Sequence, residues 1–299
     1  MATTTIDDKK TRRATSVGLT KKHRTLIGNS IAWIALAIGG IMMLLPFAWM
    51  VSASLKGLDE IYAFPPRFIP EQILWSNYVE AWTALPFGTF FLNSFIVSTS
   101  VVFGQLFTCS LAGYAFARLR FPGRDKLFLL YLSTMMIPFA VIMIPLYVQF
   151  RTIGWIDKLW PLIIPAIFAP WGTFLMRQFM STLPKELEDA ARIDGCSFFR
   201  LYRTIILPLT KPALATLGIF TFLGTWNNFL WPLIILSSVA NKTLPLGLMM
   251  FRTRLPMQTP WQLVMAASTF AIIPVLIIFV MGQKYYVRGI VTSGIKGGG

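Results

Sequence analysis

The sequence predicts an all-α protein that crosses a membrane six times. Hydrophobic residues make up 55% of the chain and charged residues only 13%, a balance typical of polytopic membrane proteins. Six stretches contain no Asp, Glu, Lys or Arg, and each has about the 18 apolar positions that a bilayer crossing requires. These stretches are 25–55, 81–117, 127–150, 159–176, 212–241 and 255–283. They lack polar–apolar alternation, which favours helices over barrel strands.

The uncharged stretches predict how the chain is organised. We expect one six-helix domain over residues 27–284, between a disordered, basic tail at 1–26 and a second tail at 285–299. Prolines at 161, 165 and 170 predict a kink in the fourth span. The expected spans are about 27–53, 87–117, 127–150, 159–181, 210–236 and 261–283.

The placement of basic residues predicts the orientation of the spans. Twenty of the 27 Lys and Arg residues fall on the side of the N-terminus and seven on the other side. Cytoplasmic segments carry the excess of Lys and Arg, so both termini are predicted to be cytoplasmic. The net charge of +15 is then mostly a signal of topology. Because the basic residues flank spans and form no single patch, we expect no nucleic-acid partner.

The sequence lacks the residues of most catalytic and cofactor sites. Its single histidine is His23 and its two cysteines are Cys109 and Cys196, so neither a metal site nor a disulfide framework is predicted. No phosphate-binding G-x-x-x-x-G-K-[ST] motif occurs. The six uncharged stretches leave no charged residue in the interior of a span, which argues against ion-driven transport. We therefore assign no catalytic residue, no metal ligand and no cofactor to this chain.

A polar segment at 183–208 separates the fourth and fifth spans. Pro184 and the acidic residues after it favour the start of a helix, and Gly195 is suited to end it. Such a helix could dock a partner protein or lie on lipid headgroups. The residues expected to dock a partner are Glu188, Asp189, Ala190, Ala191, Arg192, Asp194 and Gly195.

This segment resembles the EAA loop of bacterial ABC importer permeases. The family pattern is E-A-A, three residues, G, nine residues and then I-x-L-P. Here the matching residues are Asp189-Ala190-Ala191, Gly195, Ile205, Leu207 and Pro208. The departure is Asp189, where the pattern has Glu, and Glu188 directly before it could substitute in part.

Further fragments resemble the carbohydrate-importer branch, in particular the second permease of the maltose-type system. Their order and spacing together are specific, although each is short. The branch often has Asp where this chain has Asn228. The fragments are Asn93-Ser94, Leu111 to Arg118, Phe121 to Arg124, Thr134 to Pro138, Arg177 to Phe179, Ala190 to Gly195, Trp226 to Pro232, Thr243 to Pro245 and Gly294 to Gly297.

The resemblance implies a type I ABC importer permease in a bacterial-type inner membrane. Its partners would be a second permease forming a heterodimer, two cytoplasmic ATPase subunits that bind ATP and magnesium, an extracytoplasmic solute-binding protein and the lipid bilayer. The chain itself would be no enzyme. The implied substrate is a sugar or oligosaccharide. The alternatives are a glycerol-3-phosphate or glycerophosphodiester importer of the same branch, and a membrane scaffold or sensor without transport.

The sequence also offers residues for a substrate pathway. Trp226, Asn227 and Asn228 combine an aromatic face with amides, the groups that bind sugar rings and hydroxyls. Asn93 and Gln105 are weaker predictions of the same kind. The alternative for all of these amides is hydrogen bonding between helices. The loops 56–80 and 237–260 could dock the binding protein or serve as solvated connectors.

Overall fold

The protein is described by a computed structural model that covers residues 21–253 and 259–294. It forms two units, Met1–Trp49 and Met50–Gly299, and each is described separately. The described residues are helical with irregular connections and contain no strand. Most of the predicted tail at 1–26, the end of the predicted tail at 285–299 and part of the 237–260 loop lie outside the described residues.

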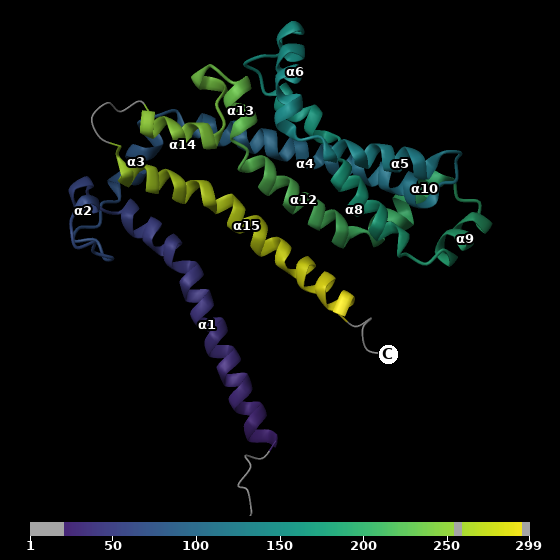
Figure 1. Cartoon of the computed structure of the whole chain (residues 1–299), viewed down its shortest axis with the longest axis horizontal. Coiled ribbons are helices and arrows are strands. Elements are labelled where there is room, and N and C mark those ends of the chain that lie inside the picture. The colour runs from purple at the N-terminus through teal and green to yellow at the C-terminus, as the bar shows by residue number, and fades with distance from the viewer. Residues whose placement is uncertain (1–20, 254–258, 295–299) are drawn as a thin grey trace, which may run out of the picture. The chain divides into compact units, whose positions relative to one another are not determined.

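Fifteen α-helices follow one another along the described chain (Figure 1). Their bounds are α1 (Lys21–Ser54), α2 (Leu58–Tyr62), α3 (Ser76–Thr83), α4 (Phe87–Arg118), α5 (Arg124–Ser133), α6 (Phe139–Thr152), α7 (Trp160–Ile163), α8 (Pro170–Ser181), α9 (Glu186–Ile193), α10 (Phe198–Leu201), α11 (Leu207–Leu209), α12 (Lys211–Trp226), α13 (Leu230–Ile235), α14 (Leu244–Thr253) and α15 (Trp261–Gly294). The remaining helical turns, which are 3-10 or π-helical, are η1 (Thr134–Met136), η2 (Pro165–Ile167), η3 (Tyr202–Ile206) and η4 (Val239–Asn241).

Four helical stretches are long and apolar enough to cross a membrane by length and composition. They are Ala32–Ser54, Phe87–Arg118, Trp160–Ser181 and Trp261–Gln283. Two bent pairs raise the number to six if each pair is one span: Arg124–Met136 with Phe139–Thr152, and Phe198–Leu209 with Lys211–Trp226. The bounds predicted for the six spans stay predictions, since no membrane boundary is defined by the helices alone.

The bends have local causes. The first pair turns by 93° at Pro138, whose backbone is extended and which cannot donate a helical hydrogen bond. The second pair turns by 76° at Thr210, two residues before Pro212 in the first turn of α12. A further break falls inside the predicted fifth span, because α12 ends at Trp226 and α13 begins at Leu230.

Helices α4 and α8 pack at very short range through glycine. A Cβ atom on Gly113 of α4 would lie 2.6 Å from Cβ of Met176, and one on Gly172 of α8 would lie 2.8 Å from Sγ of Cys109. No larger side chain fits at either position without displacing its neighbour. The pair therefore forms a tightly packed unit within the Met50–Gly299 part of the chain.

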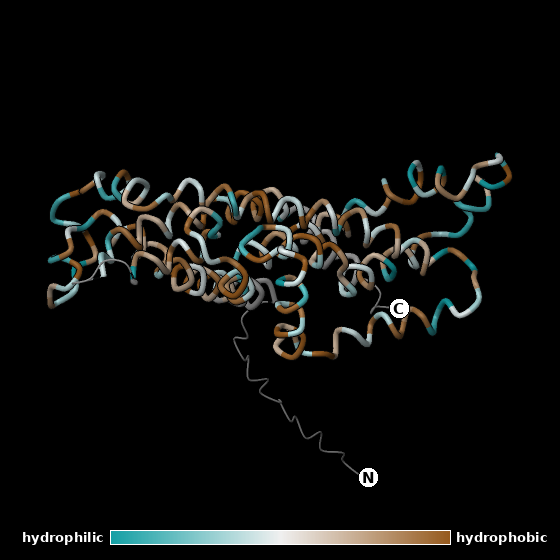
Figure 2. The backbone as a smooth tube through the Cα atoms, turned by 90° about the horizontal axis from the view of Figure 1, so that it is seen from above, coloured by the Kyte–Doolittle hydropathy of each residue, from teal (hydrophilic) through white to brown (hydrophobic). Residues whose placement is uncertain are grey.

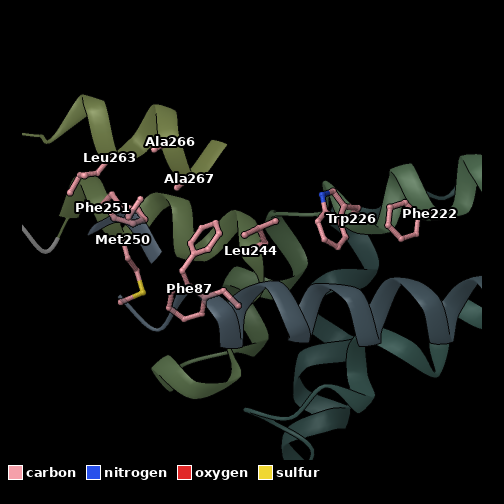
Figure 3. Close-up of a cluster of buried hydrophobic side chains, with 11 residues drawn as sticks. Phe87, Phe222, Trp226, Leu244, Met250, Phe251, Leu263, Ala266 and Ala267 are labelled. Carbon is pink, nitrogen blue, oxygen red and sulfur yellow. The ribbon is translucent and has the colours of Figure 1, made fainter. Parts of the chain in front are cut away.

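Three clusters of buried hydrophobic side chains hold this larger unit together. Figure 3 shows the first, to which α4, α12, α14 and α15 contribute Phe87, Trp226, Phe251 and Ala266, among others. The second lies where α4 and α8 meet the segment 191–217, and the third joins α4, α6, α7 and α13. Figure 2 shows hydrophilic segments at both ends of this unit and mostly apolar residues between them.

Candidate functional site

Helix α9 is a short, capped helix at one end of the Met50–Gly299 unit, away from α3 and α14 (Figure 1). Its first turn carries Glu186, Glu188 and Asp189, which favour the positive end of the helix dipole. The chain leaves it through Gly195, whose φ is +77°. A Cβ atom there would have nothing within 4 Å, so the backbone conformation, and not crowding, requires glycine. The predicted helix and its glycine stop are present.

The acidic residues in α9 and directly after it differ in exposure. Asp189 and Asp194 are exposed. The Glu188 carboxylate instead lies 3.0 Å from Nε of Arg118, with side chains only 13% and 4% exposed. Its carboxylate is thus already paired within this chain, and Asp189 is the acidic residue of the motif that faces outward.

The remaining predicted docking residues also divide into buried and exposed ones. Ala191 is buried, whereas Ala190 and Gly195 are exposed. The Arg192 guanidinium lies 4.6 Å from the centre of the Phe198 ring, a distance at which a cation and an aromatic face attract. The docking role of these residues stays a prediction.

Exposed apolar side chains accompany α9. Ile193 is 87% exposed, and Phe199 on α10 is 64% exposed. Neither was among the predicted docking residues, although an isoleucine in a polar helix directly before Asp-Gly was a usable signal. Exposed hydrophobic groups gathered at a polar helix are typical of a surface that binds a partner.

The segment after α9 anchors the loop to the helices beneath it. Ser197 caps α10 by accepting a hydrogen bond from the Arg200 backbone N–H at 3.4 Å. The π-helical turn η3 then buries Tyr202 and Ile206. Pro208 follows within α11, where its missing N–H fits the irregular hydrogen bonding of this turn.

Trp226, one of the predicted pathway residues, is buried between helices. Its Nε1 donates a hydrogen bond to the Ala271 carbonyl of α15 at 3.1 Å, and its ring stacks on Phe222. Figure 3 shows both side chains on α12. Trp226 also borders a cavity of about 300 Å³ together with Asn227. Because its side chain is buried and hydrogen-bonded to α15, its main role is in packing.

Asn227 and Asn228 lie in the break between α12 and α13, and both are exposed. The Asn227 amide donates to the Leu223 carbonyl at 2.9 Å. Asn228 lines a different cavity of about 370 Å³ beside α6 and α7. Its side-chain amide forms no hydrogen bond to the part of the chain that the structure describes. Asn228 is therefore the more available of the two amides for a ligand, because the Asn227 amide is already bonded to Leu223.

Asn93 and Gln105 are both held by other segments of the chain. Asn93 donates to the carbonyls of Ala240 and Lys242 at 2.8 and 3.0 Å. Gln105 donates to the Ala166 carbonyl at 2.7 Å and accepts from the Thr221 hydroxyl at 2.6 Å. These contacts agree with the alternative role of both residues, which is hydrogen bonding between segments of the chain. A role for either residue in a substrate pathway stays a prediction.

The opposite end of α4 supports a second polar cluster that sequence reasoning missed. Asp157 has a φ of 58°, and its carboxylate accepts hydrogen bonds from the backbone N–H groups of Ser237 and Ser238, both at 3.0 Å. Burial acts to raise the pKa of Asp157, but these donors and Asn241 outweigh it and hold the pKa below its ordinary value.

Comparisons with known proteins identify the family. The family model "Binding-protein-dependent transport system inner membrane component" matches residues 109–292. The chain is 36% identical over 280 residues to the arabinooligosaccharides transport system permease protein AraQ of Halalkalibacterium halodurans, covering 93% of this chain and all of that protein. It is 35% identical over 267 residues to the sn-glycerol-3-phosphate transport system permease protein UgpE of Yersinia pestis, covering 87% and 95%.

A solved structure confirms the fold. A chain of a bacterial ABC transporter involved in the import of the acidic polysaccharide alginate superposes with a TM-score of 0.79 at 23% identity, covering 90% of this chain and 99% of that one. The all-α permease fold predicted from the sequence is therefore confirmed, as is the resemblance to the carbohydrate branch. ATP binding in such systems belongs to partner ATPases. The chain belongs to the binding-protein-dependent transport system inner membrane components, as a multi-pass, non-catalytic permease subunit of an ABC importer.

Proposed function

We propose that this chain is a permease subunit of an ATP-driven importer of sugars or oligosaccharides. In this proposal, it and a second, different permease form a heterodimer, each providing half of the pathway. Two cytoplasmic ATPase subunits bind ATP and magnesium, and an extracytoplasmic solute-binding protein delivers the substrate.

The observation that carries the proposal is the geometry of the loop around α9. A capped helix presents Asp189 and the 87% exposed side chain of Ile193 outward, while Glu188 and Ala191 face inward. Burying an isoleucine side chain fully is more favourable than leaving it in water by roughly 1.5–3 kcal/mol of free energy. A partner cleft that covers α9 would recover this free energy, as expected for docking on an ATPase.

A sugar substrate is supported by the chemistry near the helix break. Asn228 offers an amide to a cavity, and Trp226 and Asn227 border another. Amides and aromatic faces suit hydroxyl-rich, uncharged rings. Glycerol-3-phosphate is the second substrate class, because UgpE is almost as similar as AraQ. A phosphate would favour Arg or Lys, and neither residue type lines these two cavities.

Reconstitution tests the proposal. The complete complex in liposomes, with its binding protein and internal ATP, should take up a labelled oligosaccharide and leave glycerol-3-phosphate outside. Uptake of glycerol-3-phosphate alone would establish the second substrate class. An assembled complex that imports nothing from a broad panel of solutes would refute an import function.

The proposed orientation has its own test. Single cysteines in place of Lys185 and Lys242 should react with an impermeant thiol reagent from the cytoplasmic and the outer side, respectively. Reaction at position 185 from outside would refute docking of α9 on a cytoplasmic ATPase.

A further inference from the structure

Three polar residues lie on one face of α4 near its C-terminal end. Ser110, Tyr114 and Arg118 are spaced four residues apart. At 3.6 residues per turn, positions four apart are stacked along the same side of a helix. All three side chains face the segment 186–202, which contains α9, α10 and the start of η3.

Each of the three residues holds a different part of that segment. Ser110 Oγ lies 2.7 Å from the Tyr202 hydroxyl. Tyr114 donates to the Phe198 carbonyl at 3.3 Å. Arg118 pairs with Glu188 of α9 at 3.0 Å. The order along α4 is thus the reverse of the order along the loop. Helix α4 supports the loop near its end through Ser110 and Tyr114, and at its beginning through Arg118.

The Arg118 contact joins three elements. Besides Glu188, its Nη2 donates to the carbonyls of Met180 and Leu183 at the end of α8. Both charged side chains are largely buried. Removing one member of such a pair leaves an uncompensated buried charge, while replacing both by apolar residues is often neutral for stability. A comparison of single and double variants can therefore separate a role of this pair in folding from a role in transmitting motion.

The helix that receives these contacts is suited to transmit motion. Helix α4 runs over 32 residues and contains no proline. At Gly113 it packs against α8 so closely that even one added methyl group would collide with Met176. This close packing makes α4 and α8 suited to shift together when α9 is displaced.

We propose that Ser110, Tyr114 and Arg118 are positioning residues that clamp the 186–202 segment to α4, so that α4 follows the movement of the docked loop. This inference rests on the proposed function, since it assumes that an ATPase moves α9. Asp189 and Ile193 face the partner, while Glu188 connects the loop to the membrane helices.

The first experiment separates coupling from folding. The double variant Arg118→Met with Glu188→Leu should assemble with its partners better than either single variant, because only the single variants leave a buried charge unpaired. Both variants that carry Arg118→Met also lose the hydrogen bonds to Met180 and Leu183. The double variant should import fewer solute molecules per ATP hydrolysed, by roughly fivefold or more, the lower end of typical coupling between sites. An import-to-hydrolysis ratio equal to that of the wild type would overturn the proposal.

A matched control uses a more exposed ion pair at the same end of the unit, whose Asp125 also pairs with Arg177 of α8. Arg124 and Asp125 lie 3.1 Å apart with side chains 28% and 65% exposed. Arg124→Met with Asp125→Leu removes the same charges without touching the loop, and it should leave the ratio unchanged. An equal loss in this control would attribute the effect to surface charge and overturn the clamp.

A second measurement does not depend on import. Spin labels at exposed Glu186 and Phe107, in a Cys196→Ser background, report the distance between α9 and α4 in the purified complex. The clamp requires the same narrow distance with and without ATP, and a broader one in the double variant. A wild-type distance that changes with ATP would overturn the clamp, even if the complex imports. A wild-type complex that keeps the distance but imports nothing would refute the proposed function alone.

Discussion

The two ends of α4 are both attached to irregular segments, but by different chemistry. At one end, Asn93 and the Ser94 hydroxyl fix the segment 240–244 through neutral hydrogen bonds to its backbone. At the other end, Arg118 fixes α9 through a buried ion pair. Backbone hydrogen bonds hold a loop in one shape whatever its side chains are. A contact between charged side chains instead depends on two particular residues, and it suits an element that must move as a body.

The largest effect is expected from Asn93, where the neutral attachment can be broken. Asn93→Ala removes two hydrogen bonds at once, because the carbonyls of Ala240 and Lys242 lose their donor in a part-buried site. Losing one partner of a hydrogen bond typically costs about 1–3 kcal/mol. The thermal unfolding midpoint of the purified complex should fall, while ATP hydrolysis per assembled complex should stay normal.

Ser237→Ala provides a control, because it keeps the backbone N–H that bonds to Asp157. Loss of ATP hydrolysis in assembled Asn93→Ala would contradict a purely structural attachment at this end.

The next effect concerns the middle of the molecule, between the two ends. Asn228→Ala should reduce import of a preferred sugar, with little loss of assembly. The reduction should correspond to a free energy of about 1–3 kcal/mol, typical of a lost buried hydrogen bond. Asn227→Ala, whose amide is already bonded to Leu223, should lower stability more than import. Equal, stability-linked losses in both variants would assign the two amides to packing.

A smaller effect is expected at the charged end, at Gly195. Valine there must adopt a φ of +77°, at a cost of about 1–2 kcal/mol. Gly195→Val should reduce the stimulation of ATP hydrolysis by the loaded binding protein and leave membrane insertion intact. Gly195→Asn, which tolerates this conformation, should keep most of the stimulation. Normal stimulation in the valine variant would show that the end of α9 has no part in docking.

The smallest effect is a pH dependence at the neutral end. The pKa of Asp157 lies below its ordinary value of 3.8, so its stabilising contribution is present above about pH 4 and is lost as the pH falls through the folded-state value. The backbone amides of Ser237 and Ser238 should lose hydrogen-exchange protection below pH 4. In Asp157→Asn, which does not titrate, their protection should depend less on pH. The same acid response in both proteins would rule out Asp157 as its source.

The sequence was sufficient for the features that depend on local composition. Uncharged stretches predicted the helical membrane class, and acidic residues before Gly195 predicted α9 and its end. The pairing of Glu188 with Arg118 was out of reach, because 69 residues separate them and only tertiary packing brings them together. For the same reason, Asn93 and Gln105 could not be distinguished in advance from residues open to a substrate. The break after Trp226 escaped notice because Asn227 and Asn228 are not strong helix breakers.

One unbroken helix connects both attachments, and this has a thermodynamic consequence. About 38 Å separate Asn93 and Arg118 along α4 at 1.5 Å per residue. If α4 moves as a rod, a ligand that favours one tilt of the rod at either end favours the same tilt at the other. Linkage then requires reciprocity. If a docked binding protein multiplies the affinity of α9 for its ATPase by some factor, the docked ATPase must multiply the affinity of the permease for the binding protein by the same factor.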